Sequence, residues 1–170
     1  MKIYSLFTIL LCLRLVSVGQ DLDAKRNLLL DSINFYRTNP IERVKESYGI
    51  FLDQDQYYPM NNLMFSDRLN RKAQRYAEKM ARTGDYYHSD LTGIAAESID
   101  VINVWQGEYW LTVSRLIIDE NVPDKGHRYH MLVQRDKYIG IGIAESNIIP
   151  YQSLPGDQHF IYICIQTDYH

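Results

Sequence analysis

One short stretch of the chain combines histidines, acids and a glycine turn. It runs Asp119-Glu120-Asn121-Val122-Pro123-Asp124-Lys125-Gly126-His127-Arg128-Tyr129-His130-Met131-Leu132. Because His127 follows a glycine turn and precedes a short apolar helix, its imidazole is expected at the end of an element, facing a cleft. Imidazole titrates near neutral pH, so a group in such a place can transfer protons, and its neutral form can bind a metal ion.

The same stretch holds His130, three residues after His127, and the two would share one face of a helix. This spacing suggests a local metal-binding pair, although it lacks the acid of a zinc-binding helix. A histidine at an element end can also be structural and satisfy backbone groups. No conventional nucleophile stands out, because Cys164 lies in an apolar run without a neighbouring base. Ser89 directly follows His88, and adjacency does not give the opposed geometry of a serine–histidine pair.

Several short motifs occur along the chain in a recognisable order. They are Asn34 and Arg37, Leu69 to Met80, Tyr87-His88-Ser89, Ala96-Glu97-Ser98 and Gly126-His127-Arg128. In order and spacing the chain resembles the CAP superfamily of cysteine-rich secretory, antigen 5 and pathogenesis-related proteins, and especially its small, disulfide-free bacterial members. The resemblance implies an α+β fold, a three-layer α-β-α sandwich with a small, mainly antiparallel central sheet.

The resemblance also implies a cleft that holds two histidines and two acids. The matching positions are His88, Glu97, Asp119 and His127. The last acid is placed at Asp119 by counting from Leu116, which stands where the family has a tryptophan, and Glu120 and Glu108 are alternatives. A second departure is Ala96-Glu97-Ser98, where the family has Gly-Glu-Asn, so a hydroxyl replaces an amide with more hydrogen-bonding options.

Two imidazoles and two carboxylates in one cleft suit a divalent cation, zinc or magnesium, with His88 and His127 as its ligands. They also suit proton transfer. We expect a binding module first, for a small polar ligand, a divalent cation or an extracellular partner. The alternatives are a metal-assisted hydrolase of peptides or cell-envelope material with Glu97 as the base, and a non-catalytic scaffold that presents the tyrosine pairs 57–58 and 86–87 to a protein partner.

The start of the chain has the features of a secretory signal peptide. Lys2 gives a positive start, residues 3–13 are apolar, and small residues follow before position 20. Arg14 interrupts the apolar run, which is shorter than the roughly 20 residues that a spanning helix needs. We expect cleavage of residues 1–19, no membrane span afterwards, and a secreted protein, extracellular or periplasmic, whose residues 20–170 form a single domain.

Charge and cysteine content narrow the function classes further. Residues 1–19 contain Lys2, Arg14 and no acid, so their loss takes the formal net charge from −3 to −5. A negative balance argues against nucleic acid as a partner. Cys164 is then the single cysteine, so no internal disulfide can form and stability must come from packing.

The helices that would position these residues follow from apolar spacing. Residues 22–38 have helical periodicity that ends before Pro40, and Pro40 can open a short helix over 41–47. A third helix should run from the N-cap Ser66 to Gly84. Its outer face carries a basic stripe, which we interpret as a solvated surface because such faces are normally charged. The stripe consists of Arg68, Arg71, Arg75, Lys79 and Arg82.

The second half of the chain carries the strand signals. Residues 101–108 favour a strand and 110–118 a helix. Over 139–143, isoleucines alternate with glycines, so one face of that strand is nearly bare and another element can approach it closely. Residues 160–165 are apolar on both faces of a strand, so both faces should be covered.

Overall fold

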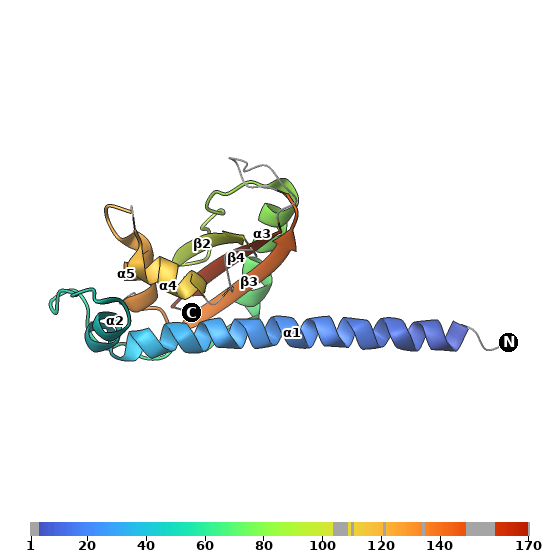
Figure 1. Ribbon diagram of the computed structural model, residues 1–170, viewed down its shortest axis with the longest axis horizontal. Coiled ribbons are helices and arrows are strands. Elements are labelled where there is room, and N and C mark those ends of the chain that lie inside the picture. The colour runs from blue at the N-terminus through green and yellow to red at the C-terminus, as the bar shows by residue number, and fades with distance from the viewer. Residues whose placement is uncertain are drawn as a thin grey trace.

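The computed structural model describes the backbone of residues 4–103, 109, 111–120, 122–133, 135–148 and 159–169, with side chains from residue 21 onward. Its elements are α1 (Tyr4–Thr38), α2 (Pro40–Tyr48), β1 (Met64–Phe65), α3 (Asp67–Thr83), β2 (Ala96–Asn103), α4 (Leu111–Ile118), α5 (Gly126–Leu132), β3 (Tyr138–Ser146) and β4 (Phe160–Asp168). The strands form one sheet between α3 on one face and α1, α4 and α5 on the other (Figure 1). The expected three-layer sandwich is confirmed.

The strand order within the described residues is β1-β3-β4-β2. β4 is antiparallel to both of its neighbours, and Glu97 of β2 lies opposite Gln166 of β4. β1 is parallel to β3 and contributes only the pairs Met64 with Tyr138 and Phe65 with Ile139. The sheet is therefore mixed but mainly antiparallel, as expected.

α3 packs against the bare face of β3 so closely that the two backbones are in contact. A Cβ atom added to Gly140 would lie 2.1 Å from the carbonyl carbon of Leu69, and one added to Gly142 would lie 2.1 Å from the carbonyl oxygen of Ala73. Neither backbone contact leaves room for any side chain. The glycine alternation of this strand thus fixes the position of α3, and with it the place where the chain leaves α3 toward His88.

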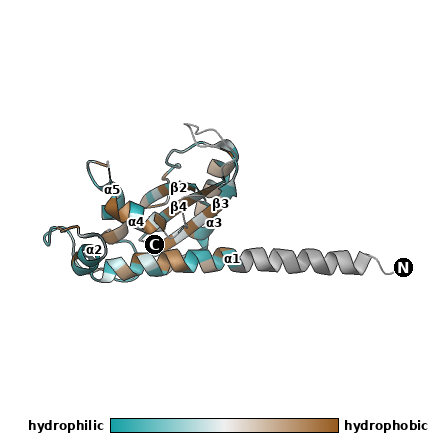
Figure 2. Cartoon of the chain, in the orientation of Figure 1, coloured by the Kyte–Doolittle hydropathy of each residue, from teal (hydrophilic) through white to brown (hydrophobic). Residues whose placement is uncertain are grey.

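Two apolar cores lie on the two sides of the sheet, and β4 contributes to both. Ile161, Ile163 and Ile165 pack with residues of α1, α4 and α5, while Tyr162 and Cys164 pack with α3. Figure 2 shows the hydrophobic colouring gathered on the central strands and the hydrophilic colouring on α2. Both faces of the last strand are covered, as its apolar composition predicts.

The ends of α3 also match their sequence signals. Ser66 Oγ accepts a hydrogen bond from the amide of Leu69 at 3.5 Å, and Gly84 adopts a left-handed φ of 72° after the last turn. β2 begins at Ala96, earlier than residues 101–108 indicated, and residues 104–108 lie outside the described part. Thr83 and Ala96 therefore delimit the segment that carries His88.

α1 begins at Tyr4, so the expected signal peptide and the first helix of the domain are one element. Cleavage after Gly19 stays a prediction. Among the described residues, no helix combines the length and the apolar character needed to cross a membrane.

The outer edge of β3 continues beyond the two-residue β1, and side chains close it. Gln74 accepts a hydrogen bond from the amide of Ile143 at 3.1 Å and donates one to its carbonyl at 2.9 Å. Arg26 donates to the carbonyl of Ile141 at 2.7 Å, and Asn70 accepts from the amide of Ile141 at 3.0 Å. These contacts satisfy an edge that would otherwise be open to another strand.

Candidate functional site

His127 and Asp119 form a tight pair at the junction of α4 and α5. Asp119 follows the last residue of α4 with a left-handed φ of 51°. Its Oδ1 lies 2.8 Å from Nδ1 of His127, and its Oδ2 accepts hydrogen bonds from the amides of His127 at 3.1 Å and Arg128 at 3.2 Å. The carboxylate therefore satisfies the first amides of α5 and orients the imidazole at the same time.

Arg128 explains why an arginine follows the histidine. Its Nε donates to the carbonyl of Ile117 at 2.6 Å, and its Nη2 donates to the carbonyl of Ile118 at 2.5 Å. These are carbonyls at the C-terminal end of α4, where a cation is favourable. The Gly126-His127-Arg128 motif thus joins two short helices and holds His127 at their junction.

His88 is paired with Glu97 in the same manner. Its Nδ1 lies 3.2 Å from Oε1 of Glu97. The Glu97 side chain is fully buried, whereas that of His88 is 52% exposed. The carboxylate is held from behind by the amide of Ser89 at 2.7 Å, by the Ser89 hydroxyl at 2.6 Å and by the amide nitrogen of Gln166 at 2.7 Å. β2 and β4 therefore provide a rigid base for an exposed imidazole.

The charge on Glu97 follows from these contacts. Burial acts to raise the pKa of Glu97, but the hydrogen bonds from Ser89, Gln166 and His88 outweigh it, and its pKa lies below the ordinary value. A carboxylate only accepts hydrogen bonds, so in the neutral form of His88 the proton is on Nδ1 and the lone pair is on Nε2. In a neutral His127 ring, the contact of Nδ1 with Oδ1 of Asp119 likewise leaves the lone pair on Nε2.

Both imidazoles line one hollow of about 460 Å³, which we call the histidine hollow. Its lining residues are His88, Leu91, Ala95, Ala96, Glu97, Val122, Asp124, Gly126, His127 and His130. The His127 side chain is 28% exposed, and that of Asp119 behind it is 2% exposed. The fold therefore brings both histidines to one cavity, and each imidazole is backed by a buried carboxylate that the protein itself holds by hydrogen bonds.

This arrangement limits what could be held there. Within the described part of the chain, no group of three or more histidine, cysteine, aspartate or glutamate side chains is placed to bind one metal ion. The two imidazoles fit the pattern of metal-binding histidines, since each gives its second nitrogen to a carboxylate. The carboxylates themselves are engaged elsewhere, so any cation there would take only two ligands from this set.

His130 does not pair with His127. It is buried, its Nδ1 lies 2.7 Å from the hydroxyl of Ser98, and its Nε2 lies 2.7 Å from the hydroxyl of Thr167. Burial, together with the nearby charge of Arg37, lowers the pKa of His130 to about 3. Both ring nitrogens face hydroxyl partners, so His130 does not form the local metal pair with His127 that the spacing suggested.

The other acids and histidines lie elsewhere. Glu120 is exposed on a neighbouring hollow of about 420 Å³ that also includes His127, and Glu108 lies outside the described residues. His159 bonds Asn147 at 2.9 Å and Glu145 at 3.0 Å, as expected for a structural residue. His170 lies outside the described part.

Sequence reasoning missed the residues that hold the pairs. Ser89 and Gln166 fix Glu97, and Ser98 and Thr167 fix His130. The alternation of β4 indicated only apolar burial, and Gln166 and Thr167 follow the segment that carried this signal. The adjacency of Ser89 to His88 was considered as a nucleophile pattern, whereas its role is to brace the carboxylate.

Comparison with known proteins places the chain by family and by fold. BmVAL-1 has a TM-score of 0.50 at 17% identity, over 84% of this chain and 76% of that chain. The crystal structure of NaASP2 with Zn²⁺ has a TM-score of 0.49 at 12% identity, over 83% of this chain and 77% of that one. No functionally curated protein shows significant sequence similarity. The model of the cysteine-rich secretory protein (CAP) family matches residues 30–166, and the chain therefore belongs to that family.

Proposed function

We propose that this protein is a secreted binding module whose histidine hollow takes a small polar ligand or a divalent cation through His88 and His127. One observation carries the proposal: each imidazole has its Nδ1 fixed by a buried carboxylate, and both line the same hollow. Nε2 of each ring has no hydrogen-bond partner among the described residues. Two oriented lone pairs in one cavity can coordinate a cation or accept protons from a polar ligand.

Zinc is the cation whose chemistry suits these groups best. Neutral imidazole is a common zinc ligand, while magnesium prefers carboxylate and water oxygens, and here the carboxylates already accept hydrogen bonds from the protein. Two imidazoles are fewer than the three or four protein ligands of most zinc sites. We therefore expect weaker zinc binding than in a complete protein site, with the remaining positions open to water or to donor atoms of a ligand.

Metal-assisted hydrolysis is less well supported. A general base must reach the proton that it removes. The Glu97 side chain is fully buried, and its carboxylate already accepts hydrogen bonds from Ser89, Gln166 and His88. Positioning His88 is the role that these contacts support, and this favours binding over catalysis.

Export is the second part of the proposal. Residues 1–19 have the composition of a signal peptide, and Cys164 is the one cysteine that would remain after their removal. The partner or ligand is then a molecule met outside the cytoplasm. Mass spectrometry of the protein from an exporting host tests this directly: a mature chain that begins near residue 20 supports export, and the full-length chain alone contradicts it.

Calorimetric titration with zinc tests the histidine hollow. The proteins are wild type, His88→Ala with His127→Ala, and His159→Ala as a matched control, because His159 is a partly exposed histidine outside the hollow. We expect saturable heat for wild type and for the control, and none above dilution for the double variant. Magnesium should give no heat with any of them. Equal zinc heats for wild type and the double variant would eliminate the cation part of the proposal.

A further inference from the structure

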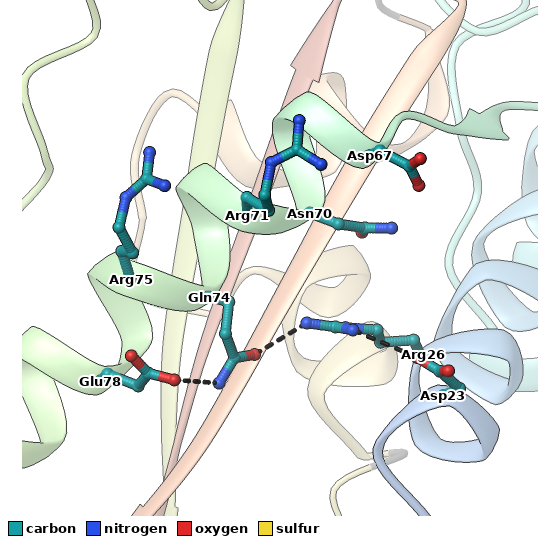
Figure 3. A pocket seen from close by; sticks show the side chains of 8 residues that line it. All are labelled: Asp23, Arg26, Asp67, Asn70, Arg71, Gln74, Arg75 and Glu78. Atoms are coloured by element: carbon teal, nitrogen blue, oxygen red, sulfur yellow. Dashed lines mark hydrogen bonds and ion pairs between the residues drawn. The ribbon is translucent and has the colours of Figure 1, made fainter. Parts of the chain in front are cut away.

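A further hollow, of about 370 Å³, lies near the outer edge of β3 and is lined by side chains of α1 and α3 (Figure 3). Its lining residues are Asp23, Arg26, Asp67, Asn70, Arg71, Gln74, Arg75 and Glu78. We call it the arginine hollow. It shares no lining residue with the histidine hollow, and every residue that lines it is polar or charged.

The acids of the arginine hollow already have favourable interactions. Asp23 pairs with Arg26 at 3.2 Å, and Glu78 accepts a hydrogen bond from Gln74 at 3.0 Å. Asp67 lies in the first turn of α3, where the helix dipole favours a negative charge. Arg26 is also engaged, because it bonds Gln74 and the carbonyl of Ile141 as well as Asp23.

Arg71 and Arg75 are different. Both are exposed, and neither forms a hydrogen bond or an ion pair with the described residues. They are four residues apart on one helix, a spacing at which two like charges destabilise the helix slightly. In Figure 3 both guanidinium groups extend from the same side of α3, away from the contact between Arg26 and Gln74. Two unpaired guanidinium groups that line the same hollow are available to bind an anion.

Asn70 adds a donor to the same hollow. Its Oδ1 accepts the hydrogen bond from the amide of Ile141 at 3.0 Å. Its Nδ2 hydrogens then remain for a ligand, since no described residue accepts them. Each arginine presents a planar fork of donors that matches the oxygens of an oxyanion. Two guanidinium groups and a side-chain amide offer more hydrogen-bond donors than the two oxygens of a carboxylate can accept. They match the three oxygens of a phosphate or sulfate group.

We infer that the arginine hollow binds the phosphate or sulfate group of a small soluble molecule, held by the guanidinium groups of Arg71 and Arg75 and the side-chain amide of Asn70. A soluble ligand fits better than a membrane, because a membrane-binding surface needs exposed apolar residues beside its cations and this lining has none. The formal net charge of −3 also opposes attraction to an extended anionic surface. The volume is in the range of small-ligand pockets.

Titration with sodium phosphate and sodium sulfate, followed by amide ¹H–¹⁵N correlation spectra, tests this inference. Sodium chloride keeps the ionic strength constant. The variants are Arg71→Ala with Arg75→Ala, Arg71→Lys with Arg75→Lys, and Arg82→Ala. Arg82 is the matched control, because it is an exposed arginine on α3 that does not line the hollow.

We expect saturable shifts around Asn70 in wild type and in Arg82→Ala, and affinity weaker by roughly tenfold or more in the double alanine variant, since two charge-assisted contacts are lost. The double lysine variant should bind more weakly than wild type, because an ammonium group lacks the fork. Circular dichroism should show that all variants fold, as the replaced side chains have no partner among the described residues.

Three results would overturn the inference: no saturable shifts in wild type, equal weakening by Arg82→Ala and by the double alanine variant, or lysine variants that bind as well as wild type. Vesicles that contain an anionic phospholipid form a further arm. If Arg82→Ala reduces vesicle binding as much as the double alanine variant does, the vesicles bind to the charged face of α3 as a whole. The arginine hollow would then be rejected as a specific site. The double variant His88→Ala with His127→Ala should bind phosphate as wild type does. The zinc and phosphate experiments therefore test the histidine hollow and the arginine hollow independently.

Discussion

His130 should make this protein lose stability in mild acid. In the folded state its ring is buried between the hydroxyls of Ser98 and Thr167, and its pKa is lowered from 6.5 to about 3. Burial is the main cause. The charge of Arg37 acts in the same direction, as do His127 and His88 when they are protonated, and Glu97 opposes them. The unfolded chain binds a proton at this histidine below pH 6.5, while the folded chain stays neutral there.

The sign and size of the effect follow from proton linkage. Between the two pKa values the unfolded state binds more protons, so the free energy of unfolding falls as pH falls, by about 1.4 kcal/mol per pH unit. At pH 5 the pH lies about 1.5 units below the unfolded pKa, which gives a loss of about 2 kcal/mol relative to pH 7. The loss should level off near pH 3, where the folded histidine itself binds a proton.

Urea unfolding of wild type and His130→Gln at pH 7, 6 and 5 measures this effect. Glutamine keeps a donor and an acceptor for the two hydroxyls but does not titrate. Contributions of the other titrating groups largely cancel in the difference between the two proteins. We expect the stability advantage of wild type over the variant to shrink by about 2 kcal/mol from pH 7 to pH 5. A difference that stays constant would refute the assignment of His130 as a buried neutral ring.

Two further predictions concern packing and the site. Gly142→Ala should lower the free energy of unfolding by about 2–3 kcal/mol, because its Cβ would meet the Ala73 carbonyl, whereas Gly126→Ala, whose nearest atom would lie 3.5 Å away, should change it by less than about 1 kcal/mol. Thermal unfolding of both variants checks this, and equal melting temperatures would contradict the close approach of α3. Asp119→Asn should weaken zinc binding by about 10–100-fold, because the amide holds His127 less firmly, while the fold survives since asparagine tolerates the left-handed backbone. Zinc affinity equal to that of wild type would show that Asp119 does not orient the ring.

Much of the fold was predictable because its signals are local. The alternation of isoleucine and glycine over 139–143 indicated a bare strand face, and α3 lies against it. The doubly apolar run 160–165 indicated a strand covered on both sides, and two cores cover it. Ser66 and Gly84 marked the ends of α3 because a cap and a left-handed turn depend on neighbouring residues alone.

The site was predictable only in part, because its contacts join distant segments. The resemblance gave the positions of His88 and His127 but not the direction of the acids. The Glu97 carboxylate is buried and held by Ser89 and Gln166, and Gln166 is 69 residues away along the chain. No local pattern reports such a partner.

The arginine hollow also could not be predicted from local sequence patterns. The sequence shows a basic helix face, and a solvated surface is the usual meaning of such a face. Only the tertiary contacts of each arginine separate the members of the stripe. Arg68 bonds Asp168 and the carbonyl of Gly93, whereas Arg71 and Arg75 are left unpaired beside a hollow.

The proposed function depends on Nε2 of both His88 and His127 facing one cavity and binding there. Long-range ¹H–¹⁵N correlation of the histidine side chains during a zinc titration observes these atoms directly. We expect the Nε2 signals of both rings to shift together to one saturation point, while the Nδ1 protons stay in place and the His130 signals do not move. Independent shifts of the two rings, or binding through only one of them, would contradict it.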